Sequence, residues 1–309
     1  VAGTYTCTIT DANGCQLVHA KTVTQPVTLS ATSVVTNVSC NGLATGAINI
    51  TAANGTGAYG YAWVASGTGA LNNNAANTED LTAIVAGTYT CTITDANGCQ
   101  LVHAKTVTQP VTLSATSVVT NILCTGLATG AINITAANGT AAYGYAWVAS
   151  GTGALNNNAA NTEDLTAVVA GTYTCTITDA NGCQLVHAKT LTQPAAALSA
   201  TSVVTNVSCN GLATGAINIT AANGTGAYGY AWVASGTGAL NNNAANTEDL
   251  TAIVAGTYTC TITDANGCQL VHAKTVTQPV TLSATSVVTN VSCNGLATGA
   301  INITAANGT

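Results

Sequence analysis

The chain has 309 residues, a formal net charge of −6 at pH 7 and only 5% charged residues. Ten acidic residues against four lysines supply no basic surface for a phosphate backbone, so nucleic acid is not expected as a partner. Although 47% of the residues are hydrophobic, no stretch approaches the roughly 20 continuous apolar residues of a spanning helix. We therefore expect no membrane span in this segment.

One sequence block recurs along the chain. VAGTYTCTITDANGCQLVHAKT begins at Val1, Val85, Val169 and Val254, which gives a period of 84 residues that is lengthened once to 85. This period exceeds that of common solenoid repeats and approaches the size of a small domain. The repeat therefore predicts separate units joined end to end, each with its own core.

The proline of each period fixes where one unit ends. The single length change falls beside Pro194, and insertions are tolerated where few contacts cross. We expect complete units at 27–110, 111–194 and 195–279, with 1–26 the C-terminal part of an earlier unit and 280–309 the N-terminal part of a later one. We accordingly interpret the sequence as a window on a longer protein.

Within the unit 27–110, residue patterns predict short strands and no helix. Thr and Val favour strands, whereas Gly and Asn favour turns. Tyr59, Tyr61 and Trp63 alternate at the period of a strand, so we expect Trp63 at the centre of the core. The expected strands, in chain order, cover residues 28–38, 46–52, 58–64, 81–85, 87–95 and 99–108. A turn at Cys40 and a loop around residues 72–74 separate them.

The last two strands form the clearest hairpin. Asn97-Gly98 between two strand-like runs predicts a two-residue turn, with Ile93 facing Val102 and Cys91 facing Ala104. Six or seven short strands in one period predict an all-β, two-sheet sandwich. We expect one tryptophan and one tyrosine in the core of each sandwich. They are Trp63 and Tyr89 in the first unit, Trp147 and Tyr173 in the second, and Trp232 and Tyr258 in the third.

Four segments together resemble a known family. VSCNGLATGAINI, GAYGYAWVASG, TEDLTAIVAGTYTCTITDANGC and VTQP are similar to the SprB-type repeat of bacterial gliding-motility adhesins, over essentially every residue of each unit. The resemblance implies tandem immunoglobulin- or PKD-like modules in a very long cell-surface protein of the Bacteroidetes, exported by type IX secretion. Cys91 departs from the family pattern, in which an aliphatic residue is usual.

Twelve cysteines, three per period, indicate an oxidising, extracellular location, since no C-x-x-C motif is present. Cys91 and Cys99 are too far apart across their hairpin for a bridge. We predict Cys40–Cys99, Cys124–Cys183 and Cys209–Cys268 disulfides within the units. Cys91, Cys175 and Cys260 are then buried thiols. A Cys40–Cys91 bridge or a link between chains remains an alternative, and Cys15 and Cys293 should pair beyond the window.

The remaining polar residues give no catalytic or metal-binding pattern. His103 and Lys105 stand alone on the last strand, and Glu79 and Asp80 point to opposite faces of theirs. Asp95 opens the Asn-Gly turn, where a structural role is ordinary. Two alternatives would give the polar residues a chemical role. They are an isopeptide bond formed by Lys105 and a calcium ion bound at a loop end. We expect no enzyme activity and no cofactor.

The sequence thus predicts a repetitive extracellular filament or adhesin segment that provides reach and multivalent weak attachment, with gliding motility as one use. The alternative is a passive stalk or sheath whose binding activity lies elsewhere in the chain. Expected partners are other repeats of the same chain, like chains in a filament, and a surface or polysaccharide.

Overall fold

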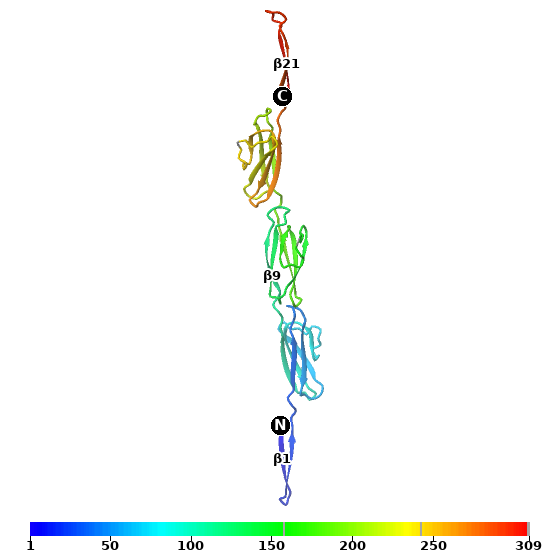
Figure 1. Cartoon of the computed structure of the whole chain (residues 1–309). Coiled ribbons are helices and arrows are strands. Elements are labelled where there is room, and N and C mark those ends of the chain that lie inside the picture. Colours follow the sequence, from blue (N-terminus) through cyan, green and yellow to red (C-terminus); the bar gives the residue numbers. More distant parts are fainter. Residues whose placement is uncertain (157, 242, 308–309) are drawn as a thin grey trace.

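A computed structural model describes residues 1–156, 158–241 and 243–307. Asn157, Asn242, Gly308 and Thr309, which fall within the predicted units, lie outside the described residues. Three compact units follow one another along a line, and a two-stranded hairpin projects from each end of the row (Figure 1). In the described ranges, the regular secondary structure consists of β-strands, as the sequence predicts.

The first unit is a sandwich of two three-stranded antiparallel sheets. One sheet has the order β3-β4-β6 and the other has the order β5-β7-β8. This division matches strands A, B and E and strands C, F and G of an immunoglobulin-type sandwich. The strand bounds are β3 Ser30–Thr36, β4 Gly46–Ala53, β5 Gly60–Ser66, β6 Leu81–Ile84, β7 Gly87–Thr94 and β8 Gln100–Val107.

The second and third units repeat this topology with the same strand order. The second unit contains β9 Ser114–Thr120, β10 Gly130–Ala137, β11 Gly144–Ser150, β12 Leu165–Val168, β13 Gly171–Thr178 and β14 Gln184–Leu191. The third contains β15 Ser199–Thr205, β16 Gly215–Ala222, β17 Gly229–Ser235, β18 Leu250–Ile253, β19 Gly256–Thr263 and β20 Gln269–Val276.

The two end hairpins carry the same sequences without a facing sheet. They consist of β1 Gly3–Thr10 with β2 Gln16–Val23, and of β21 Ser283–Thr289 with β22 Ala300–Ala306. Tyr5 is 54% exposed here, whereas its counterpart Tyr89 in the first unit is 0% exposed. The facing sheet is therefore needed to bury this aromatic side chain.

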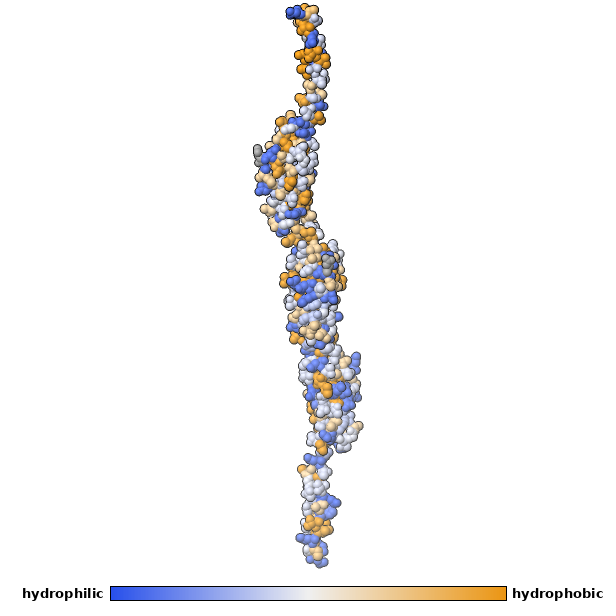
Figure 2. Space-filling view, viewed as in Figure 1, coloured by the Kyte–Doolittle hydropathy of each residue, from blue (hydrophilic) through white to orange (hydrophobic). Residues whose placement is uncertain are grey.

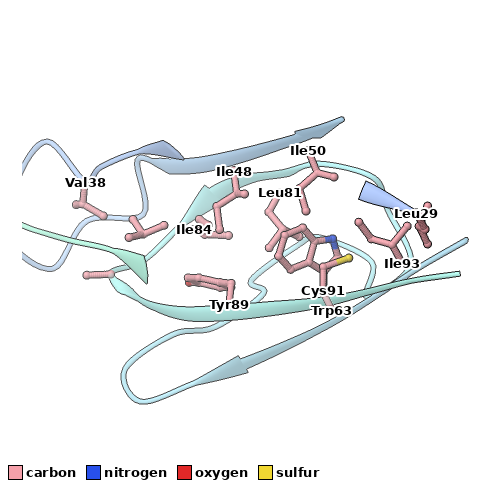
Figure 3. Packing of buried hydrophobic residues seen from close by; sticks show 12 residues of the cluster. Leu29, Val38, Ile48, Ile50, Trp63, Leu81, Ile84, Tyr89, Cys91 and Ile93 are labelled. Carbon is pink, nitrogen blue, oxygen red and sulfur yellow. The ribbon is translucent and has the colours of Figure 1, made fainter. Parts of the chain in front are cut away.

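The core of the first unit forms around Trp63 and Tyr89, between the two sheets (Figure 3). Period-two alternation sends Tyr89, Cys91 and Ile93 of β7 inward, where all three are fully buried. The Trp63 indole nitrogen donates a hydrogen bond to the Thr78 carbonyl at 2.9 Å, so the ring is buried without leaving its polar group unpaired. The predicted core residues of all three units lie in these clusters: Trp63, Trp147, Trp232, Tyr89, Tyr173 and Tyr258.

Tyr89 forms the tyrosine corner of the sandwich. Its hydroxyl lies 2.8 Å from the carbonyl oxygen of Val85, four residues upstream, and accepts from the Ala70 amide at 3.2 Å. Burial raises the pKa of Tyr89. This bond ties the crossover before β7 to the core, as in immunoglobulin-type domains.

A side chain replaces a missing fourth strand beside β6. The Asn74 amide donates to the Thr82 carbonyl at 2.6 Å and accepts from the Thr82 amide at 3.0 Å, as a paired strand would. An open strand edge invites pairing with other chains, so this contact also covers the edge of the first sheet.

The predicted hairpin register is wrong by one residue. The structure pairs Cys91 with His103 and Ile93 with Leu101, because the loop has three residues instead of two. The Gly98 amide donates to the Asp95 carbonyl at 2.9 Å and Gly98 has φ +81°, which describes a type I turn closed by a left-handed glycine.

We propose that the predicted boundaries delimit units that fold independently. The three buried clusters draw their residues from 29–107, 113–191 and 198–276 respectively, with no residue shared. Each unit also carries one tryptophan, so fluorescence can follow the three cores together.

Leu165→Ala should unfold only the second unit early. Leu165 is fully buried, and removing its side chain leaves a cavity that costs about 2–5 kcal/mol. We expect denaturant unfolding, followed by tryptophan fluorescence, to become biphasic with roughly a third of the change moved to lower denaturant. The exposed-site variant Val148→Ala should keep the wild-type curve. A single shifted transition for Leu165→Ala would show that the units do not unfold separately.

Candidate functional site: the junction between units

Disulfides join neighbouring units. Cys40 is bonded to Cys183 and Cys124 to Cys268, with Cα atoms 5.4 Å and 5.5 Å apart. Each bond links the turn after the first strand of one unit to the turn before the last strand of the next. The predicted pairings within units are therefore wrong: Cys40–Cys99, Cys124–Cys183 and Cys209–Cys268.

The predicted pairings fail because the first and last strands of a unit run in the same direction. Ser33 contacts His103 at 3.0 Å and the Val38 amide donates to the Thr108 carbonyl at 2.9 Å, so β3 and β8 run side by side in the same direction. The end of β3 and the start of β8 then lie at opposite ends of the sandwich. Seven residues of strand separate them by roughly 23 Å, well beyond the ~7 Å Cα separation that a disulfide can span.

The turn that carries Cys40 is fixed to the end of its own unit. The Gly42 amide donates to the Gln109 side-chain oxygen at 2.8 Å, and the Asn41 amide group donates to the Pro110 carbonyl at 3.0 Å. Gly42 has φ +78°, a conformation that glycine adopts without strain. Cys40 is consequently held beside the peptide bond that leads into the next unit.

The turn that carries Cys183 is fixed by a buried carboxylate. Asp179 is 6% exposed, and one of its oxygens accepts from the amides of Asn181 and Cys183, both at 2.9 Å. The other oxygen accepts from the Thr140 amide at 3.0 Å. These backbone hydrogen bonds, the one from Thr140 foremost, hold the pKa of Asp179 below its usual range.

Asp95 and Asp264 occupy the same position in the other two units, with the same three backbone donors. The pKa of each is lowered in the same way. The predicted structural role of Asp95 thus extends to orienting the cysteine of the turn.

The third cysteine of each unit is not part of a junction. Cys91, Cys175 and Cys260 are fully buried and unpaired, and burial raises the pKa of each thiol. The alternative Cys40–Cys91 bridge is also wrong. Cys7, Cys15, Cys99, Cys209 and Cys293 are exposed and unpaired in this structure.

His103 connects the two sheets. Its Nε2 atom lies 3.0 Å from the Ser33 hydroxyl, which joins the last strand to the first. Burial, followed by the charge of Lys105, lowers the pKa of His103. Within the described ranges, no three His, Cys, Asp or Glu side chains gather as they would around a metal ion.

The neighbouring carboxylates Glu79 and Asp80 have separate structural contacts. Glu79 accepts a hydrogen bond from the Tyr61 hydroxyl at 2.9 Å. Burial, together with this contact, raises the pKa of Tyr61 to about 12. Asp80 accepts from the Ile50 amide at 2.9 Å. Both residues therefore support the fold through separate contacts.

The outer face of the second sheet carries no charged residue. In its register, Val64 lies beside Thr90 and Ala104, and Ala62 lies beside Thr92 and Val102. Val64 and Val102 are each 66% exposed. We call this surface the Thr/Val face, and in the first unit it comprises Ala62, Val64, Ser66, Thr88, Thr90, Thr92, Thr94, Val102, Ala104 and Thr106. Figure 2 shows apolar and hydrophilic residues interspersed along the visible side of the whole array.

Taken together, the fold and the junctions define a tandem array of covalently joined β-sandwich modules. The SprB repeat family matches at residues 32–68, 116–152 and 201–237. Three segments of the chain, one in each complete unit, therefore match the SprB repeat. Each match covers the first half of a unit, from β3 to the end of β5, which is narrower than the resemblance over the whole unit that the sequence suggested.

No curated protein matches the chain. Among solved structures, the eight N-terminal Ig domains of Down Syndrome Cell Adhesion Molecule share 13% identity and a TM-score of 0.33, over 90% of this chain and 40% of that one. Invasin, a bacterial integrin-binding protein, shares 13% identity with a TM-score of 0.29, over 93% and 68%. A tetra-tandem repeat in the extending region of a large adhesion protein shares 13% with a TM-score of 0.30, over 89% and 82%. The chain covers less than half of the length of the Down Syndrome Cell Adhesion Molecule chain.

No helix long and apolar enough to cross a membrane occurs in the described part of the chain.

Asp179→Asn should weaken the acid sensitivity of the second unit. Because the folded pKa of Asp179 lies below its unfolded value near 3.9, its contribution to stability is complete above that value and is lost as the pH falls through the folded pKa. We expect the variant to be less stable than wild type at pH 7, with the difference shrinking towards pH 2. Urea unfolding across this range measures it.

Asn158→Ala provides the control, since Asn158 bonds the Thr166 backbone and carries no ionisable group. It should lower stability by a similar amount at every pH and retain the wild-type dependence on pH. If Asp179→Asn retained it as well, the three backbone hydrogen bonds would not favour the ionised carboxylate.

Proposed function

We propose that the chain is a segment of an extracellular filament that gives a cell surface reach and multivalent weak attachment. The observation that carries this proposal is the row of near-identical SprB repeats joined by a disulfide as well as a peptide bond at each junction between complete units. Repetition of one rigid module is suited to spanning distance, and it presents the same surface many times.

The reach follows from strand length. Strands of seven or eight residues at ~3.3 Å each span roughly 25 Å, and the turns at both ends bring each unit to roughly 30–40 Å, so three units extend on the order of 100 Å. Longer arrays of the same unit would extend in proportion.

An extracellular location is supported by the junction disulfides, because such bonds persist in oxidising compartments. Placement in a Bacteroidetes surface protein, export by type IX secretion and a role in gliding motility follow from the resemblance to SprB repeats. We include the surface placement, the export route and the motility role in the proposed function because of this resemblance.

The Thr/Val face is the surface we propose for attachment. It is uncharged, carries exposed valines and is repeated in each unit, so it can approach a polysaccharide or a like chain without electrostatic repulsion. Each contact would be weak, and binding through several units at once would raise the overall affinity.

The role is structural and adhesive instead of enzymatic. Asp95, Glu79 and Asp80 accept hydrogen bonds from the backbone or from Tyr61, and His103 contacts Ser33. These groups therefore have contacts that account for them without a substrate.

A passive stalk is the second candidate. It is favoured by the same row of doubly linked units, because such an array needs no ligand of its own to separate a tip from the cell. The two candidates differ only in whether the repeats themselves bind.

Charges placed on the Thr/Val face should abolish attachment. Val64, Val148 and Val233 are 65–66% exposed at equivalent positions, so the triple variant to Glu should fold normally. We expect its retention on glass and on agar, a polysaccharide, to fall more than tenfold in a flow assay with chain-coated beads, because the loss recurs at each unit.

The matched control is the triple variant of Val34, Val118 and Val203 to Glu, on the outer face of the other sheet, where the residues are 70–71% exposed. It should bind as wild type does. Equal binding of all three proteins would contradict attachment through the Thr/Val face, and no binding by wild type would favour the passive stalk.

A further inference from the structure

We propose that the junction disulfides carry tension past the interior of each unit, so that the array behaves as an inextensible, load-bearing cable. This inference concerns the mechanics of the chain and goes beyond attachment. It depends on which residues are bonded, and it holds whether or not the repeats bind a surface.

Two covalent links cross each junction between complete units. At the first junction they are the peptide bond from Pro110 to Val111 and the disulfide from Cys40 to Cys183. The hydrogen bonds from Asn41 to Pro110 and from Gly42 to Gln109 hold the starting points of the two links together. A pulling force that reaches this end of the first unit therefore acts on both covalent links together.

These links connect first and last strands into two continuous tracks. One track follows β3 to Cys40, crosses to Cys183, follows β14 to Pro194 and enters β15. The other follows β8 to Pro110, enters β9, crosses from Cys124 to Cys268 and follows β20. Because the first and last strands of a unit run in the same direction, both tracks advance along the array throughout.

The second unit shows the consequence most clearly, since it has a disulfide at each end. Its tracks use only residues 111–124 and 183–194. Residues 125–182 include β10 to β13 and the core residues Trp147 and Tyr173, and they form a covalent loop between the tracks. Tension carried along either track cannot draw this loop out while the disulfides remain.

The two tracks can lengthen only slightly under tension. A strand already rises ~3.3 Å per residue, against a limit of about 3.6 Å for a fully extended chain. A unit without disulfides could instead lengthen to about 290 Å when its 84 residues are pulled straight. The disulfides therefore remove most of the extension that unfolding would otherwise allow.

The two tracks are also joined to each other within each unit. His187 contacts Ser117 at 2.9 Å, and the Ile122 amide donates to the Thr192 carbonyl at 2.9 Å, so β9 and β14 are coupled along their length. Load applied to one track is shared with the other through contacts that must shear together.

Single-molecule pulling between two internal points of the whole chain tests the proposal. Attachment groups introduced at Val27 and Ala196, both exposed, place the first two units between the handles. Along the shorter covalent route, through residues 27–40 and 183–196, the oxidised chain should stop near a handle separation of ~100 Å. The double variant Cys40→Ser/Cys183→Ser should reach ~590 Å, in unfolding steps.

Cys124→Ser/Cys268→Ser is the matched control. It also removes one disulfide, but that bond does not shorten the route between the handles, so the control should stop near ~100 Å as wild type does. If the Cys40→Ser/Cys183→Ser variant fails to fold, wild-type chain reduced with a phosphine while under low force gives the same comparison. Extension of the oxidised wild type to ~590 Å, or equal extension of the two double variants, would overturn the proposal.

Discussion

The parallel course of the first and last strands of each unit is the constraint from which the rest of the array follows. It places the turn after β3 at one end of the sandwich and the turn before β8 at the other, so the two cysteines of one unit cannot meet. Cys40, Cys124, Cys183 and Cys268 each bond to a neighbouring unit instead. The same geometry makes the chain enter and leave a unit at opposite ends, which arranges the units in a row (Figure 1).

Much of the unit itself could be predicted from the sequence. Period-two alternation identified Trp63 and Tyr89 as inward-facing residues, because a strand shows its burial pattern locally. The hairpin register could not be obtained in the same way. Asn97-Gly98 favours a two-residue turn, but Asp95 accepts backbone amides on the far side and Gly98 alone takes the left-handed conformation, which adds a residue to the loop.

The junction could not be predicted from spacing, because Cys99 and Cys183 have identical neighbours in the sequence. Only the relative direction of the strands distinguishes a bond within a unit from a bond to the next. That direction depends on tertiary structure. Cys91 was correctly predicted to be a buried thiol, whereas the choice of partner for the other two cysteines of each period needed the arrangement of whole units.

Peptide mapping without reduction tests this arrangement most directly. The chain has one lysine in each period, and cleavage after Lys21, Lys105, Lys189 and Lys274 in urea, with thiols blocked, gives the peptides 22–105, 106–189 and 190–274. Bonds between units should hold these three peptides in one covalent species, which separates on reduction. Recovery of three separate peptides, each with an internal disulfide, would contradict the doubly linked junction.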